Sequence, residues 1–223
     1  MGFKTGIVTD PYWATTIEDA VEWLNPISKL GLSNFSVSED AFHQEEEGRN
    51  NPKNAIEAAK KLGIPIDTIT IEEPTPSISE RAGLKGKPVT GGEVMFRGRA
   101  VEKLVDGLPR KPWTEFRECH HEDLANPSRV HIDPFGFVHL CQGLTMGSCK
   151  EEPLSELIRS YDPVSHPICS LLIEGGPVAL VKKYDVPHED GYVDECHLCY
   201  CTRLALRSRF AKYLAPGQMY GKL

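Results

Sequence analysis

The seven cysteines are the residues of this 223-residue chain best suited to chemistry. A cysteine thiolate is a soft, strongly donating ligand that binds zinc or iron. The first residues do not resemble a secretory signal, so we expect a cytoplasmic protein whose thiols are reduced rather than paired in disulfides. Metal or redox chemistry is therefore the first expectation. No cysteine occurs among the first 118 residues, and the seven cysteines are Cys119, Cys141, Cys149, Cys169, Cys196, Cys199 and Cys201.

Four of these cysteines have a spacing that favours a shared metal centre. Cys196-His-Leu-Cys199 has the two-residue spacing that lets consecutive thiolates bind one centre, in zinc knuckles and in iron-sulfur sites alike. Cys141 ends the second strand of a predicted hairpin and Cys119 precedes the first strand, so folding of the hairpin brings these two thiols to one end. The sequence therefore predicts four thiolate ligands, and the spacing is compatible with zinc and with iron.

The other cysteines and the neighbouring histidines leave alternatives open. Cys149, Cys169 and Cys201 are interpreted as reduced, buried or incidental thiols, and Cys201 is the first substitute if Cys199 is not a ligand. The remaining alternative is a zinc-stabilised structural or partner-binding module, in which three histidines beside the cysteines complete a mixed site. These histidines are His120, His121 and His197.

The first part of the chain has the pattern of an α/β fold. Short strands are expected at 6–9, 35–38 and 64–71. Between them, Thr16 starts a capped helix with apolar residues on one face, and Asn51 and Pro52 start another that Gly63 ends. Strands separated by helices predict βαβ units with a parallel sheet. About three strands make a small sheet of this kind, so we expect an incomplete sheet whose edge is covered by a partner chain or by a second copy.

The second part of the chain is separated from the first by a connector rich in proline and glycine. This connector runs from Glu73 to about Pro112 and holds at most one short helix, near 99–105. A hairpin is expected over 130–140 about a Pro-Phe-Gly turn, and helices over 153–161, 176–184 and 202–214. We therefore expect two domains, at 1–112 and 113–223.

The second part resembles the SPASM or twitch extension of radical S-adenosylmethionine enzymes. The resemblance lies in the run from Cys119 through Gly136 to Cys141 with four residues between the last two, in the hairpin Asp133-Pro-Phe-Gly-Phe-Val, and in Pro153-Leu-Ser-Glu-Leu. It implies that Cys119, Cys141, Cys196 and Cys199 ligate one auxiliary [4Fe-4S] cluster. The gap from Cys119 to Gly136 is slightly long, and the tail lacks the full SPASM series of cysteines, so one twitch-like cluster is expected rather than two.

The first part resembles a fragment of the β/α barrel of the same family. Gly6-Ile-Val-Thr-Asp is similar to a barrel strand, and Phe35-Ser-Val-Ser-Glu-Asp to the strand that follows it. By this resemblance Ser38 and Asp40 contact S-adenosylmethionine or substrate, while the alternative is that both residues cap the next segment. The C-x-x-x-C-x-x-C motif of the catalytic cluster is absent, and Gly91-Gly92-Glu93 lies in the wrong place for the segment that binds the cofactor's methionine group. We therefore expect a carboxy-terminal portion that does not cleave S-adenosylmethionine alone.

Composition narrows the range of partners. The formal net charge is −7 and no run of lysine and arginine occurs, which argues against nucleic acid because phosphate binding needs a clustered positive surface. No stretch approaches the roughly 20 apolar residues of a membrane span. A peptide or a small molecule remains the expected class of substrate.

Overall fold

The computed structural model describes residues 4–43, 50–76, 89–90 and 94–221, which form two compact units. The first unit comprises Met1–Pro74 with Gly91–Val94, and the second comprises Thr75–Thr90 with Met95–Leu223. The division falls inside the connector rich in proline and glycine, and Gly91-Gly92-Glu93 lies outside the described residues. No helix in the described part of the chain is long and apolar enough to cross a lipid bilayer.

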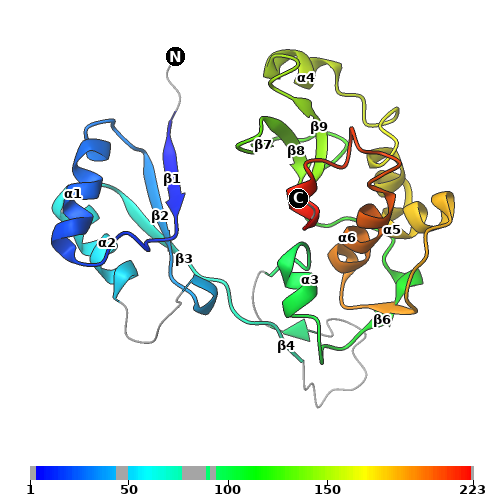
Figure 1. Ribbon diagram of the computed structural model, residues 1–223, viewed down its shortest axis with the longest axis horizontal. Coiled ribbons are helices and arrows are strands. Elements are labelled where there is room, and N and C mark those ends of the chain that lie inside the picture. Colours follow the sequence, from blue (N-terminus) through cyan, green and yellow to red (C-terminus); the bar gives the residue numbers. More distant parts are fainter. Residues whose placement is uncertain (1–3, 44–49, 77–88, 91–93, 222–223) are drawn as a thin grey trace. The chain divides into compact units, whose positions relative to one another are not determined.

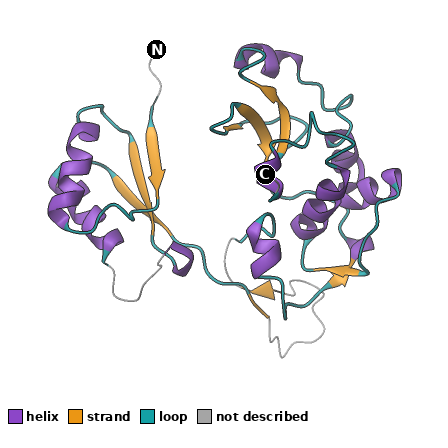
Figure 2. Ribbon diagram, in the orientation of Figure 1, coloured by secondary structure: helices purple, strands orange, loops and turns teal. Residues whose placement is uncertain are grey.

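The first unit is a three-stranded parallel sheet with the order β1-β2-β3 (Figures 1 and 2). Ile7 pairs with Phe35, and Phe35 pairs with Ile66 on the other side. The parallel sheet with helical crossovers is therefore confirmed. The elements of this unit are β1 (Gly6–Thr9), α1 (Ile17–Ser28), β2 (Asn34–Ser38), the 3-10 turn Ala41–His43, α2 (Asn51–Lys61) and β3 (Ile66–Ile69).

The two helices of the first unit pack against one face of the central strand. Phe35 and Val37 of β2 are 1% and 0% exposed, and they join a core with buried alanines and Leu24 from α1 and α2. The Thr16 hydroxyl accepts the Asp19 N–H at 3.0 Å, as expected of a helix cap. The expectation for α2 was wrong by one residue, because Asn50 is the cap and Asn51 already belongs to the helix.

The sheets of the described residues do not show whether the first unit is a fragment of a β/α barrel. Among the described residues no sheet closes on itself, and the first unit is an α/β layer of three strands and two helices. The mixed α/β class is confirmed, whereas the barrel fragment stays a prediction.

The second unit is built around a three-stranded antiparallel sheet with the order β7-β8-β9. The hairpin of β7 and β8 forms about the expected Pro-Phe-Gly turn, and β9 is a third strand that sequence reasoning did not place. The elements of this unit are β4 (Thr75–Pro76), β5 (Val89–Thr90), α3 (Arg99–Lys103), β6 (Lys111–Pro112), the 3-10 turn Trp113–Glu115, β7 (His131–Ile132), β8 (Phe137–Cys141), β9 (Leu144–Ser148), α4 (Leu154–Ser160), α5 (Cys169–Tyr184), β10 (Gly191–Tyr192), α6 (Glu195–Leu206) and the 3-10 turn Gly217–Tyr220.

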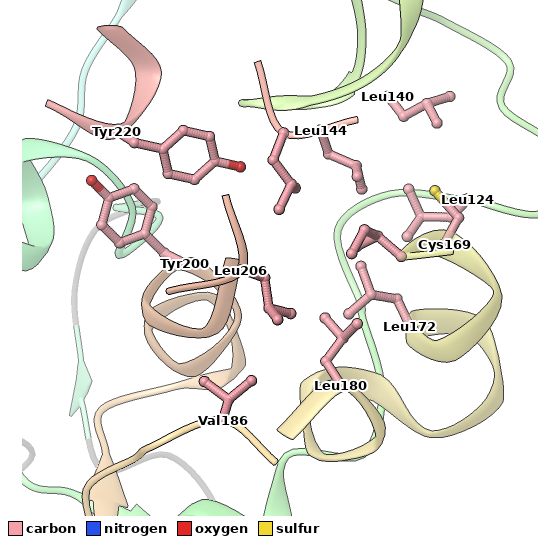
Figure 3. Close-up of a cluster of buried hydrophobic side chains, with 12 residues drawn as sticks. Leu124, Leu140, Leu144, Cys169, Leu172, Leu180, Val186, Tyr200, Leu206 and Tyr220 are labelled. Carbon is pink, nitrogen blue, oxygen red and sulfur yellow. The ribbon is translucent and has the colours of Figure 1, made fainter. Parts of the chain in front are cut away.

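One apolar core joins α5, α6 and the sheet of the second unit (Figure 3). Leu144, Leu180 and Leu214 are each 0% exposed. The rings of Tyr200 and Tyr220 stack with centroids 5.7 Å apart and close one end of the cluster. This core supports the elements that carry the cysteines, because it contacts the end of β8 and the inner face of α6.

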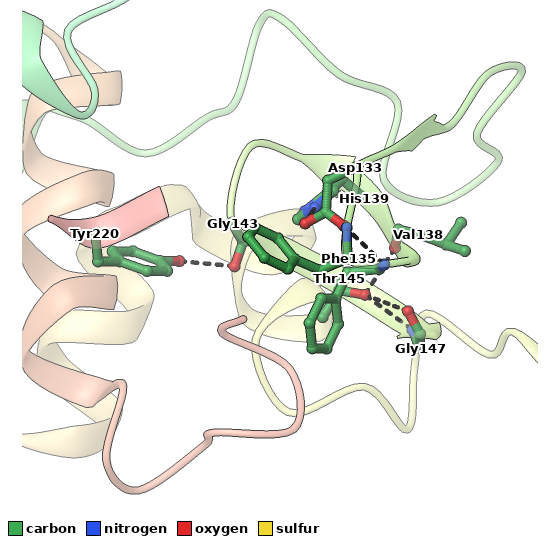
Figure 4. Close-up of polar contacts among 9 residues, drawn as sticks. Asp133, Phe135, Val138, His139, Gly143, Thr145, Gly147 and Tyr220 are labelled. Carbon is green, nitrogen blue, oxygen red and sulfur yellow. Dashed lines mark hydrogen bonds and ion pairs between the residues drawn. The ribbon is translucent and has the colours of Figure 1, made fainter. Parts of the chain in front are cut away.

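Buried polar contacts hold the hairpin in register (Figure 4). The Thr145 hydroxyl lies 2.8 Å from the carbonyl oxygens of Val138 and Gly147 and accepts the Gly147 N–H at 3.0 Å. Nε2 of His139 lies 3.0 Å from the Asp133 carboxylate, which also accepts the backbone N–H of Phe137. Together these contacts fix the strand that ends at Cys141.

The last expected helix was misplaced. It was predicted over 202–214, but α6 spans Glu195–Leu206. The Asp194 carboxylate caps it by accepting the His197 N–H at 2.7 Å. The Cys-x-x-Cys pair therefore lies in the first two turns of a helix and not in a loop.

Candidate metal centre

The first turns of α6 present two cysteines and an arginine on one face. Cys196, Cys199 and Arg203 are three and four residues apart, which places them along one side of a helix. Cys199 is half-buried and Arg203 is 2% exposed, so this face points into the protein. The two-residue spacing thus places Cys196 and Cys199 on the same face because the segment is helical.

Cys141 reaches the same region from the end of β8. The turn that follows it is fixed by two side chains from elsewhere in the unit. The Arg203 guanidinium donates to the carbonyl oxygen of Gln142 at 2.9 Å, and the Tyr220 hydroxyl donates to that of Gly143 at 2.8 Å. Arg203 therefore lies beside two of the cysteines and also holds the backbone that carries a third.

Cys119 is positioned by a close backbone contact with α5. This helix is interrupted at Gly175 and Gly176, and Gly176 has a φ of +61°. A Cβ at Gly176 would lie 2.4 Å from the carbonyl carbon of Arg117 and 2.5 Å from the nitrogen of Glu118. Glycine is needed at this position because of its positive φ and because of this close contact. The contact places the segment that precedes Cys119 against α5.

The four predicted ligands line one small cavity. Cys119, Cys141, Cys196 and Cys199 all contribute to its wall, together with the guanidinium groups of Arg97 and Arg203. Arg97 donates a hydrogen bond to the sulfur of Cys141 at 3.0 Å. The other residues of the wall are Glu118, His121, Leu172, Pro177 and Glu195. We call this space the cysteine cavity.

The electrostatics of the cysteine cavity depend on burial and on the proximity of the thiols to one another. Burial raises the pKa of Cys196 well above the usual range of a thiol, and nearby Asp194, Cys199 and Cys141 raise it further. Burial raises the pKa of Cys199 to about 11 against the lowering effect of Arg203, while Cys141 and Cys119 add to the rise. These mutual effects show that the thiols lie within electrostatic range of one another. Without a metal, Cys196 and Cys199 are neutral at pH 7.

Arg203 is a buried cation that lacks a buried anion. Burial lowers its pKa, but Tyr220 and the thiols of Cys199, Cys141 and Cys196 outweigh this effect and raise the pKa above its usual value. Its Nε atom has no hydrogen-bond partner, and among the described residues no carboxylate forms an ion pair with it. An uncompensated charge in a protein interior is costly. The residues around the cavity therefore fit a net anionic group, such as a metal centre bound by thiolates, better than four neutral thiols.

The positions of the side chains bear on the kind of metal. A single tetrahedral zinc ion with Zn–S bonds of about 2.3 Å holds its sulfurs roughly 3.8 Å apart. No three His, Cys, Asp or Glu side chains of the described residues are grouped closely enough to hold one metal ion. A cubane cluster binds each thiolate at a different iron and so tolerates wider spacing.

The histidines proposed for a mixed zinc site lie in three different surroundings. His121 lines the cavity and lies 3.5 Å from the carboxylate of Glu195, whereas the side chain of His120 is 64% exposed. His197 is buried against Tyr192, and its Nδ1 accepts the Val193 N–H at 3.3 Å. Burial lowers the pKa of His197 to about 4. Of the described histidines, only His121 contributes to the wall of the cavity.

The three remaining cysteines differ in exposure. Cys169 is 0% exposed and belongs to the apolar core, Cys201 packs against that core, and Cys149 is exposed. Burial raises the pKa of Cys169 to about 12 and that of Cys201 to about 11. Their interpretation as structural thiols stays a prediction.

In the first unit, Ser38 is the last residue of β2 and Asp40 lies two residues further along the chain. Ser38 is buried and alternates with Val37, so it lies on the face of the strand away from the helices. The carboxylate of Asp40 accepts the N–H groups of Phe42 and Ile71 and lies 2.7 Å from Nδ1 of His43. Asp40 therefore fixes the loop after the strand, and its contact with a cofactor stays a prediction.

Arg97, Arg203 and Gly176 were missed by sequence reasoning. The only sequence signal for Arg203 was its spacing of four residues from Cys199, which becomes informative once the segment is known to be helical. Searches with protein-family models and against curated proteins found no match to this chain. The function is therefore argued from the residues and their geometry.

Proposed function

We propose that the second unit binds one [4Fe-4S] cluster through Cys119, Cys141, Cys196 and Cys199. The observation that carries the proposal is the meeting of these four thiols with the uncompensated guanidinium of Arg203 at one cavity. Thiolates bound to the cluster would supply negative charge that balances the positive charge of Arg203. The first turn of α6 adds to this effect, because the positive end of a helix dipole favours anionic ligands at Cys196.

The cluster is proposed to carry electrons. Cys119, Cys141, Cys196 and Cys199 would supply a full set of four cysteine ligands, which would leave the cluster to electron transfer rather than to substrate binding. When bound, such a cluster supplies one-electron redox chemistry at a potential set by hydrogen bonds and burial. The chain's own residues hold the ligands in place and exclude water, with Leu172 and Pro177 forming the apolar part of the wall.

We place this unit with the auxiliary-cluster modules of radical S-adenosylmethionine proteins. The support is the pattern of Cys119, Gly136 and Cys141, in which the last two belong to the hairpin of β7 and β8. Cleavage of S-adenosylmethionine in that family uses a separate cluster bound by three closely spaced cysteines. None of the residues before Cys119 is a cysteine, so these 223 residues are proposed not to cleave S-adenosylmethionine by themselves.

Metal analysis tests the proposal. Protein purified without oxygen is assayed for iron, acid-labile sulfide and zinc, and its visible absorption is recorded. We expect about four iron and four sulfide per chain with a broad charge-transfer absorption. One zinc per chain and no visible absorption would replace the proposal by a zinc-stabilised module, and a metal-free folded protein that also fails to take up iron and sulfide would refute both.

A further inference from the structure

The arginine beside Cys141 is placed to act on the electronic properties of a metal centre. Nη1 of Arg97 donates to the sulfur of Cys141 at 3.0 Å, and Arg97 also lines the cysteine cavity. Glu118 and Glu195 line the same wall, and among the described residues no carboxylate forms an ion pair with Arg97. A charge-assisted hydrogen bond to a ligand sulfur withdraws electron density from it.

We infer that Arg97 raises the reduction potential of the cluster bound at the cysteine cavity, an inference that rests on the proposed function. In the titration a reduced redox mediator gives up one electron and is oxidised, and the cluster would take up that electron. The extra negative charge is stabilised by the guanidinium beside Cys141, so the reduced form gains more from Arg97 than the oxidised form does. Hydrogen bonds to sulfur and local charge are recognised determinants of cluster potentials.

Arg97 and Arg203 contribute to this effect in different ways. Arg203 also donates to the carbonyl oxygen of Gln142 and is fully buried, so replacing it disturbs the turn after Cys141. Arg97 is half-buried, and within the described residues its side chain makes a single hydrogen bond, which goes to Cys141. Arg97 is therefore the residue whose replacement changes the charge near the cluster with the least change in the fold.

The test is a spectroelectrochemical titration of the full chain carrying its cluster. Arg97→Gln removes the charge, and Arg97→Lys keeps the charge but changes the donor. Arg159→Gln is the matched control, because Arg159 is exposed and pairs with Glu156 on α4. We expect Arg97→Gln to make reduction less favourable by about tenfold, which is about 59 mV for a one-electron couple. Arg97→Lys should give a smaller shift and Arg159→Gln none.

The outcomes separate this inference from the proposed function. Wild-type protein that takes up no cluster refutes the proposed function, and the inference with it. A cluster present in all four proteins with the same potential refutes the inference alone. If Arg97→Gln and Arg97→Lys both lose the cluster while circular dichroism shows a native fold, Arg97 is required for assembly and the proposed tuning role is wrong.

Discussion

Replacing Gly176 by alanine tests how α5 positions Cys119. Two costs follow from the structure. With a φ of +61° and a ψ of −162°, Gly176 has a backbone conformation that is open essentially only to glycine, so a side chain there costs about 1–3 kcal/mol. The new methyl group would also lie 2.4 Å from the backbone of Arg117, and relief of such overpacking costs about 1–3 kcal/mol. The free energy of unfolding of the second unit should therefore fall by about 2–6 kcal/mol.

Gly107→Ala is the matched control for this change. Gly107 has a φ of +76°, and no atom lies within 4 Å of the position of its Cβ. Both variants place a side chain at a positive φ and reduce the chain entropy of the unfolded state. The difference between them therefore reports the contact with Arg117 and Glu118, at about 1–3 kcal/mol, together with the difference in backbone strain between the two positions.

Hydrogen exchange of the peptides covering α5 measures the difference within the second unit. A difference of about 1–3 kcal/mol corresponds to about 5- to 150-fold faster exchange in Gly176→Ala than in Gly107→Ala. The iron content after anaerobic reconstitution should also be lower in Gly176→Ala, because relief of the clash moves the chain that leads into Cys119. Equal exchange rates and equal iron contents in the two variants would refute this account.

Two further predictions concern groups in the second unit away from the cysteine cavity. His166 is buried and its pKa is lowered from 6.5 mainly by burial, so below about pH 6.5 the unfolded chain takes up a proton that the folded chain does not, and stability falls. His166→Asn keeps an acceptor for the N–H groups of Ile168 and Cys169 but does not titrate in this range. Urea titrations between about pH 7 and pH 5 should show that the stability of this variant relative to wild type rises as the pH falls. A constant difference in stability would contradict this. Thr145→Val should cost about 1–3 kcal/mol, because the half-buried Gly147 N–H loses its bond to the Thr145 hydroxyl, and thermal unfolding compared with the exposed control Thr114→Val checks it.

Local signals in the sequence predicted much of the fold. Thr16 and the apolar face that includes Ala20 and Leu24 lie within one helix, so the cap and the period are both visible without tertiary information. The hairpin about Gly136 was predicted for the same reason, since a tight turn and two alternating strands are contiguous. The third strand, β9, was missed because Gly147 weakens the alternation of its five residues, and its pairing with β8 supplies what the local pattern lacks.

The candidate site was only partly visible in the sequence. The four cysteines were chosen by spacing, and the structure brings them to one cavity. The start of α6 was missed because the Cys-x-x-Cys pair was interpreted only as a pair of metal ligands, although Asp194 before Glu195 is a good helix start. The burial of Arg203 and the contact of Gly176 with Arg117 are tertiary properties, and no pattern within a short window distinguishes them from a surface arginine and a loop glycine.

A scan of all seven cysteines tests the central claim most directly. Each cysteine is replaced by serine in turn, and iron and sulfide per chain are measured after reconstitution without oxygen. The account predicts that the cluster is lost or reduced in the variants of Cys119, Cys141, Cys196 and Cys199, and that it is kept at wild-type content in those of Cys149, Cys169 and Cys201. Full iron and sulfide in any of the first four variants, or loss of the cluster in a folded Cys201→Ser protein, would contradict the proposed ligand set.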